Sequence, residues 1–299
     1  DLDTYSAVVV DEHRFGALTV DAGLRWSREY LNDYGAFNID ASAKKFKSVD
    51  AVTDEWAPSV LNGSIGASYY LSPSISLHSN LAVGGVSPRK GTLDIYGNEP
   101  ENERRVKFDA GARFIKDKLG EVSVVGFATQ QKDAIVLSGQ TQTDEVSGRT
   151  MELYMNRDQD QLGIEIDAKS APVYNMAKLF FNIVSMRSRA DINGDMQRDK
   201  EMPQQIVSAG IYSSFLHCDG NFFWKYVSSY ESTRFTSGIK PQSLGNFSSV
   251  NITAGRSFGS TLRTRIYIEI RNLFDKSFST VVGYPDFGRR YTFGLRQTL

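Results

Sequence analysis

The stretch RTRIYIEIRNLFDK, Arg263–Lys276, decides the fold class. In its first part apolar and polar side chains alternate, with isoleucine at positions 266, 268 and 270. A period of two places successive side chains on opposite faces, which predicts a β-strand with one apolar face. The opposite face carries Arg263, Arg265, Glu269 and Arg271. This strand therefore needs an apolar medium on one side and water or a charged partner on the other.

The same period recurs along the chain and predicts about thirteen strands. Their expected ranges are Asp3–Arg14, Ala17–Tyr30, Glu55–Leu71, Ser74–Ser87, Arg104–Lys116, Gly120–Leu137, Thr150–Lys169, Asn175–Ala190, Gln204–Leu216, Asn221–Phe235, Asn246–Phe258, Thr261–Asp275 and Arg289–Leu299. Several exceed the usual length of strands in water-soluble sheets. In one strand Leu18, Leu24 and Trp26 share a face opposite Arg25. Val124 and Val125 are both apolar, so their strand leaves its phase open.

Composition narrows the class of protein. The chain has 299 residues, 23% of them charged, with a net charge of −1, so we expect no nucleic-acid partner. No apolar run approaches the roughly 18 residues of a transmembrane helix. The mean hydropathy of −0.33 suits strands that present one row of side chains to lipid and the other to water.

The predicted connections alternate in length. Short ones are expected at 15–16, 72–73, 117–119, 170–174, 217–220 and 259–260, whereas long polar ones cover 31–54, 88–103, 138–149, 191–203, 236–245 and 276–288. Tight turns at one end and long loops at the other are typical of outer-membrane barrels. Because lipid offers no hydrogen bonds, such a sheet must close on itself. The expected fold is an all-β, transmembrane, antiparallel up-and-down β-barrel.

The strand count raises a question about the ends of the chain. Bacterial outer-membrane barrels of one chain have even strand numbers, and thirteen is odd. The last connection is long, so the final strand is expected to end at the periplasmic side, and counting back places residue 1 at the outer side. Either N-terminal strands precede this sequence or the count is wrong by one.

The end of the chain carries three closely spaced motifs: Asn272-Leu-Phe-Asp-Lys276, Gly283-Tyr-Pro285 and Gly288-Arg-Arg-Tyr291. Together they resemble the C-terminal signature of TonB-dependent outer-membrane receptors. Weaker similarities, in the family's order, are Leu18–Arg25, Gly85–Arg89, Tyr96–Glu101, Leu162–Glu165 and the Pro203 region. The final strand departs from the family pattern at Gln297 and Leu299, where aromatic residues are favoured.

The resemblance implies a domain and its partners. Residues 1–299 would form a receptor-like barrel domain, the C-terminal part of a 22-stranded barrel, without the plug domain and first strands. The implied partners are outer-membrane lipid, the plug, the TonB energy-coupling complex acting through that plug, and an extracellular metal chelate. The implied location is the bacterial outer membrane.

Three functions compete. The resemblance favours energy-coupled uptake of a large, scarce nutrient, a ferric siderophore above others. A passive porin would instead select solutes at a charged constriction. A soluble all-β binding module such as a propeller would show repeats of about 40–50 residues, which the sequence lacks.

Two sets of candidate site residues follow from charge and position. At the outer mouth, cations and aromatic rings could hold an anionic or aromatic chelate, and the candidates are Arg28, Tyr30, Tyr34, Arg89 and Tyr96. For Trp26 and Tyr30 an interfacial aromatic girdle is the alternative. Facing the lumen or a plug, the candidates are Arg25, Arg263, Arg265, Glu269 and Arg271, with ion pairs between neighbouring strands as the alternative.

Catalysis has little support in the sequence. His13, His78 and His217 lie on separate predicted strands or turns, and no nucleophile, phosphate-loop or zinc spacing appears. The segment Asp191-Ile-Asn-Gly-Asp195 resembles a calcium loop only faintly, since Met202 stands at position twelve. We expect no enzyme activity, no catalytic residue, no metal ligand and no cofactor.

Overall fold

The structure is a computed structural model of the 299-residue chain. It describes residues 2–32, 34–40, 45–52, 55–89, 92–143, 150–232, 242–259 and 263–298. Within these ranges only the backbone is described for 34–40, 45–52, 263 and 298.

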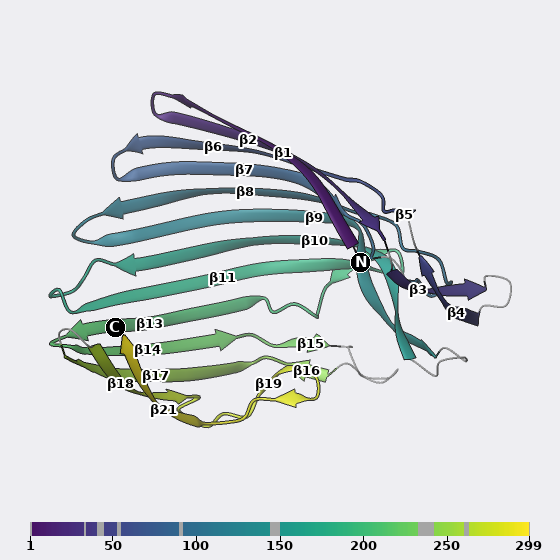
Figure 1. The fold of residues 1–299 in the computed structure, drawn as a ribbon. Helices are drawn as coiled ribbons and strands as arrows, with labels where there is room; N and C mark the ends of the chain where they lie inside the picture. Colours follow the sequence, from purple (N-terminus) through teal and green to yellow (C-terminus); the bar gives the residue numbers. More distant parts are fainter. Residues whose placement is uncertain are drawn as a thin grey trace.

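Thirteen strands follow one another in a single antiparallel sheet, as the sequence predicts (Figure 1). In sheet order they are β1 Leu2–Phe15, β2 Leu18–Leu31, β6 Val60–Ser72, β7 Ile75–Val86, β8 Glu103–Lys116, β9 Gly120–Thr143, β10 Thr150–Ser170, β11 Ala177–Ile192, β13 Gln205–Phe215, β14 Cys218–Val227, β17 Phe247–Phe258, β18 Arg263–Arg271 and β21 Arg290–Thr298. Each strand pairs with its neighbours in this order, which is the up-and-down topology of a barrel wall.

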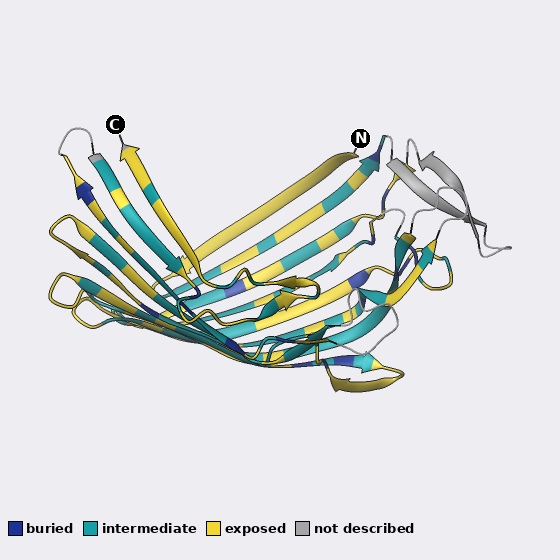
Figure 2. Ribbon diagram, turned by 90° about the horizontal axis from the view of Figure 1, so that it is seen from below, coloured by how far each residue is buried: buried dark blue, intermediate teal, exposed yellow. Residues whose placement is uncertain are grey.

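The sheet curves into an open trough whose two edges are β1 and β21 (Figure 2). The tight turns gather at one end, here called the turn end, and the long connections at the other, the loop end (Figure 1). Strand β1 starts at the loop end, and β21 finishes at the turn end. Both termini therefore lie where the alternation of connections predicts them.

Within the described residues the chain also contains eight short strands, of which only β5 and β15 fall within predicted strand ranges. They are β3 Tyr34–Asp40, β4 Lys45–Val52, β5 Glu55–Trp56, β12 Asp195–Arg198, β15 Tyr230–Ser232, β16 Gln242–Leu244, β19 Ser279–Val281 and β20 Tyr284–Pro285. Two expected strands are also broken. Glu55–Leu71 is interrupted at Pro58, which has no N–H to donate to a ladder, and Asn221–Phe235 is interrupted at residues 228–229.

Register assigns every side chain of the wall to one of two faces. The apolar face carries rows such as Leu81, Phe108, Ala128 and Leu162, and Ala112, Val124 and Ile166. The polar face carries rows such as Gly111, Val125 and Glu165. Val124 thus lies on the apolar face and Val125 on the polar face, which settles the phase that the sequence leaves open. Leu162 of the apolar face is 64% exposed and Phe293 79%, as expected of side chains that meet lipid rather than a protein core.

The polar face is the crowded, inner side of the trough. A Cβ atom at Gly66 would lie 2.5 Å from Asp21 Oδ1, and one at Gly294 would collide with the ring of Tyr267. On the apolar face a Cβ at Gly63 would meet only ordinary contacts, the nearest at 3.6 Å. Glycine on the inner side therefore leaves room where side chains converge across the curvature.

The described part of the chain contains no helix long and apolar enough to cross a membrane.

Candidate functional site

The polar face has a hollow near the β1 edge, lined by three cationic side chains. Arg25 of β2 shares this hollow of about 430 Å³ with Arg105 and Lys107 of β8. Val8 and Val10 of β1 form its apolar margin. Arg25, predicted to face the lumen, therefore belongs to a cationic group drawn from separate strands.

A charged pair spans three strands near the opposite edge. The Nε atom of Arg265 on β18 donates to Asp219 Oδ1 of β14 at 2.9 Å, and Nη2 donates to Oδ2. Strand β17 lies between them, and Gly255 stands where the guanidinium crosses. A Cβ at Gly255 would lie 2.7 Å from Arg265 Nη2, so glycine keeps this path open. The Arg265 Cζ atom also lies 4.9 Å from the centroid of the Tyr267 ring.

The remaining predicted lumen residues lie on the same strand. Arg271 Nε donates to Glu269 Oε1 at 2.6 Å, which ties two of them together. Arg271 faces Arg290 of β21 in the register, and Arg265 faces Arg296. Arg263 begins β18, but its side chain lies outside the part that the structure describes. The β18–β21 edge of the polar face is therefore predominantly cationic.

Four basic residues of these groups are absent from the sequence-based candidates. They are Arg105, Lys107, Arg290 and Arg296. Each lies among the polar residues of an alternating strand. The alternation in residues 104–116 and 290–298 could therefore have identified them as residues of the polar face. Arg25 and Arg265 are not brought together, because β2 and β18 stand near opposite ends of the strand order.

Replacing Asp219→Asn tests whether the three-strand pair stabilises the wall. The Arg265 and Asp219 side chains are 27% and 23% exposed, so the neutral variant leaves a poorly solvated guanidinium without its carboxylate. We expect a loss of about 1–2 kcal/mol in the free energy of unfolding. Unfolding of the protein purified from outer membranes, followed as a function of guanidinium chloride concentration, measures this loss. Glu269→Gln, whose partner Arg271 is 53% exposed, is the control and is expected to cost less. An equal loss in both variants would contradict this account.

Two of the predicted mouth residues form an aromatic cluster at the loop end. Arg28 Nε donates to the Ala57 carbonyl at 2.9 Å, and its Cζ lies 4.9 Å from the Trp56 ring centroid. The Tyr30 and Tyr5 rings lie 4.8 and 5.4 Å from the same ring. Arg28 and Tyr30 share the phase of Leu24 and Trp26, on the apolar face. This geometry favours the aromatic girdle, and ligand binding by these residues stays a prediction.

The other mouth candidates do not join this cluster. Tyr96 is 73% exposed, and its N–H donates to Asp94 Oδ1 at 2.8 Å. Arg89 is exposed, and its carbonyl accepts from the Thr92 N–H at 2.9 Å. Tyr34 begins β3, and its side chain lies outside the described part. Their role in ligand binding is likewise a prediction.

The loop that carries Tyr96 is anchored to the wall. Leu93 packs against Leu153 of β10, and its carbonyl accepts from the Tyr154 N–H at 2.8 Å. The Glu101 N–H donates to Asn156 Oδ1 at 2.8 Å, and Asn156 Nδ2 donates back to the Glu101 carbonyl at 3.0 Å. Tyr96 is therefore displayed on a fixed loop beside β10.

The signature segment Asn272–Lys276 is held together by a local network of hydrogen bonds. Asn272 is 4% exposed and has a φ of 51°. Its Nδ2 donates to the Lys276 carbonyl at 2.8 Å, and its Oδ1 accepts from the Lys276 N–H at 3.0 Å. The Arg289 N–H donates to Asp275 Oδ1 at 2.8 Å, which ties the end of the loop to its beginning. These residues shape the loop before β21.

Residues 278 and 280, just after this segment, contact β17 and β15. Phe278 stacks on Phe247 with centroids 4.0 Å apart. The Tyr230 hydroxyl donates to the Thr280 carbonyl at 2.9 Å, and burial raises the pKa of this phenol. The hydroxyl therefore stays protonated and keeps donating across the neutral range.

The described residues contain no group of three or more His, Cys, Asp or Glu side chains placed to hold a metal ion. The faint calcium-loop segment forms the β11–β12 hairpin, where Asp191 Oδ1 accepts from the Gly194 N–H at 2.7 Å.

Fold and wall chemistry together define the class of protein: a transmembrane barrel wall with a charged interior. The chain belongs to the TonB-dependent receptor-like β-barrel family, whose model matches residues 1–273. Proteins of this family lie in the bacterial outer membrane, and they are receptors and transporters rather than enzymes. The family resemblance noted in the sequence is thereby confirmed. Comparison with curated proteins finds no match.

Solved structures share the fold. The ferric-catecholate import receptor Fiu from E. coli K12 superposes with a TM-score of 0.70 at 14% identity over 98% of this chain and 44% of its own. The copper transporter OprC gives 0.72 at 15% identity over 98% and 47%. The ferric yersiniabactin uptake receptor FyuA from Yersinia pestis gives 0.68 at 14% identity over 100% and 46%. The chain spans less than half the length of each of these proteins.

Proposed function

We propose that this chain forms part of the wall of an outer-membrane receptor that takes up a large, scarce nutrient by TonB-dependent energy coupling, and that the nutrient is a ferric siderophore. The observation that carries the proposal is the family match over residues 1–273. Fiu and FyuA are described as receptors for ferric chelates, whereas OprC is described as a copper transporter. Iron would enter as part of the cargo.

The charge of the polar face supports a polyanionic occupant. Arg25, Arg105 and Lys107 line one hollow, and four arginines stand on the β18–β21 edge. Cations on an inner wall attract carboxylate or catecholate groups of a chelate, and they equally fit acidic side chains of a plug. We favour the plug or neighbouring strands as the main partner of Arg265, since Asp219 already binds it.

Two other functions fit less well. A passive porin would use the same wall, but the family is one of energy-coupled receptors. A soluble binding module is opposed by the apolar face, where residues such as Leu61 and Leu162 are more than half exposed along a continuous sheet.

Radiolabelled uptake tests the proposal. Cells deleted for the gene, with and without the gene restored, are given ⁵⁵Fe loaded onto a panel of catecholate, hydroxamate and carboxylate siderophores. We expect saturable uptake of at least one chelate only with the gene present, and loss of that uptake after disruption of TonB or addition of a protonophore. Copper uptake is measured in parallel.

The outcomes separate the alternatives. Uptake that persists without TonB and rises linearly with solute concentration would indicate a porin and overturn the proposal. Energy-dependent uptake of copper but of no iron chelate would retain the receptor and replace its cargo.

A further inference from the structure

The apolar face carries an acid and a base in the middle of strand β1. In the register Asp11 and His13 lie opposite apolar residues of β2, so both side chains are on the lipid-facing side of the wall. The row of β1 on this face runs from Tyr5, in the aromatic cluster at the loop end, to Phe15 at the turn end. A membrane-spanning strand takes about 9–11 residues, so this row crosses the bilayer and Asp11 lies near its centre.

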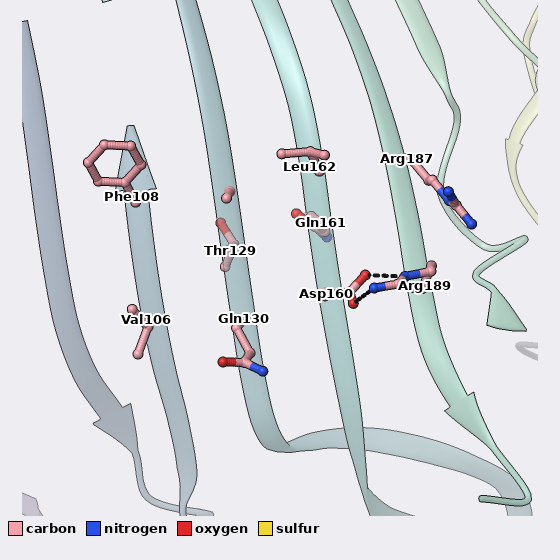
Figure 3. A pocket seen from close by; sticks show the side chains of 10 residues that line it. Val106, Phe108, Thr129, Gln130, Asp160, Gln161, Leu162, Arg187 and Arg189 are labelled. Atoms are coloured by element: carbon pink, nitrogen blue, oxygen red, sulfur yellow. Dashed lines mark hydrogen bonds and ion pairs between the residues drawn. The ribbon is translucent and has the colours of Figure 1, made fainter. Parts of the chain in front are cut away.

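The depth of these two side chains differs from that of a charged pair elsewhere on the apolar face. Asp160 and Arg189, which bind each other across β10 and β11 (Figure 3), lie ten and twelve residues from the turn ends of their strands. Asp11 lies only four residues from Phe15. On the described parts of β2, β6 and β7, the apolar rows below the aromatic cluster contain no acidic or basic side chain. An ionisable side chain at such a depth is costly without a polar partner and marks a functional contact.

The contact between the two side chains leaves part of their hydrogen-bonding capacity unused. His13 Nε2 lies 2.9 Å from Asp11 Oδ2, and the two side chains are 65% and 67% exposed. Within the described residues neither Asp11 Oδ1 nor His13 Nδ1 has a hydrogen-bond partner. Lipid tails offer no hydrogen bond, so a polar group of another molecule would stabilise both atoms.

The side chains around this pair are small or apolar. Ala7 and Val9 continue the row of β1, and Ala22 and Ala67 lie on the same face of β2 and β6. Small side chains let two backbones approach closely, as they do between helices in membranes. The surface formed here, called the β1 patch, consists of Ala7, Val9, Asp11, His13 and Ala22.

We propose that two copies of the protein pair in the outer membrane through the β1 patch. Both copies have the same orientation in the bilayer, so a two-fold axis along the membrane normal keeps every residue at its own depth. Such an axis places the same patch on both sides of the contact, and each residue pairing occurs twice. Asp11 of each copy can then bind His13 of the second copy, which satisfies the acid and the base together. The inference rests on membrane location and is independent of the proposed uptake.

A second copy fits this chemistry better than a different protein. A patch with charges of one sign would repel its own copy, whereas an acid and a base two residues apart are complementary to themselves. A different membrane protein would need to present a base and an acid at the same two depths. Contact with lipid alone leaves Asp11 and His13 without further partners.

Cysteine crosslinking in outer membranes tests the contact. The complete protein is expressed in its own cells with Cys218→Ser and either Val9→Cys, in the β1 patch, or Ile164→Cys, on β10. Val9 and Ile164 both lie on the apolar face and are 69% and 44% exposed, so the two positions are matched. We expect oxidation with copper phenanthroline to give a disulfide-linked dimer from Val9→Cys and little or none from Ile164→Cys.

A charge swap tests the roles of Asp11 and His13. Energy transfer between fluorescently labelled copies of the purified protein in lipid vesicles, measured against the protein-to-lipid ratio, gives the Kd of the dimer. We expect Asp11→Leu/His13→Leu to weaken pairing about tenfold. Asp11→His/His13→Asp is expected to restore pairing, because the swapped patch is again complementary to itself. Glu12→Gln/Arg14→Gln, on the polar face of the same strand, is the matched control and is expected to leave Kd unchanged. Heat-modifiable migration on gels verifies folding of every variant.

Four results would overturn the proposal. The wild type could stay monomeric at every protein-to-lipid ratio, or Val9→Cys and Ile164→Cys could crosslink equally, which would indicate random collision. Pairing could be as tight in Asp11→Leu/His13→Leu as in the wild type, or the charge swap could fail to restore it, which would remove the reciprocal contact. A disulfide from Val9→Cys to a different protein would replace the second copy by another partner.

Discussion

Val124→Arg is expected to lower the free energy of unfolding by about 1–3 kcal/mol, the cost of a cation that faces lipid between the turn-end interface and the middle of the membrane. Val124 lies between Ala112 and Ile166 on the apolar face. Val124 is the fifth residue of β9, which starts at the turn end, so an arginine there lies closer to the turn-end interface than to the loop end. Denaturant titration in lipid vesicles, with protein purified from outer membranes, measures the loss.

The neighbouring residue supplies the control for this prediction. Val125 is equally apolar, but it lies on the polar face between Gly111 and Glu165. An arginine there faces a wet or plugged interior and an acidic neighbour, so Val125→Arg should cost under about 1 kcal/mol. Similar losses in both variants, or a larger loss in Val125→Arg, would mean that the two faces are assigned wrongly.

Asn272→Ala is expected to cost about 2–3 kcal/mol and to expose the loop between β18 and β21 to protease. The substitution removes a buried amide that binds both the N–H and the carbonyl of Lys276, and it places alanine at a φ of 51°. Guanidinium titration and limited proteolysis of the purified protein measure the two effects.

A second variant at this position separates its two contributions. Asn272→Gly loses the same hydrogen bonds but adopts a positive φ without strain. It should therefore be more stable than Asn272→Ala by about 1 kcal/mol. If Asn272→Ala left both stability and cleavage unchanged, the hydrogen bonds of Asn272 would not stabilise the loop before β21.

The wall could be predicted from the sequence because its signal is local. Alternation predicts which residues form strands and which face each side chain takes. The pattern alone therefore predicts the thirteen long strands and the end of the sheet at which each terminus lies. The same alternation already places Arg28 and Tyr30 in the row of Leu24, although nearness to the mouth drew them into the ligand candidates. Phase is stronger evidence than nearness in a strand of this kind.

Side-chain contacts between different strands cannot be predicted from this local alternation. Arg265 and Asp219 are 46 residues apart, and their pairing depends on two registers and on the bare backbone of Gly255 between them. Val124 and Val125 are chemically identical, so only the neighbouring strands can assign their faces. The short strands β3, β4, β16, β19 and β20 each belong to a two-stranded sheet, and all of them lie in connections for which the sequence predicts no strand.

The strand order also predicts the order in which the strands of this sheet pair during folding. Every long strand pairs with the next one in the chain, so each pairing closes only the connection between them. The entropy lost in closing a segment grows slowly with its length, and tight turns such as Gly16 and Ala17 keep it small. The wall can therefore grow one hairpin at a time, with the newest strand as the template for its successor. Only the seam between the first and last strands of a complete cylinder would require a contact distant in sequence, and that seam would set the slowest step of folding.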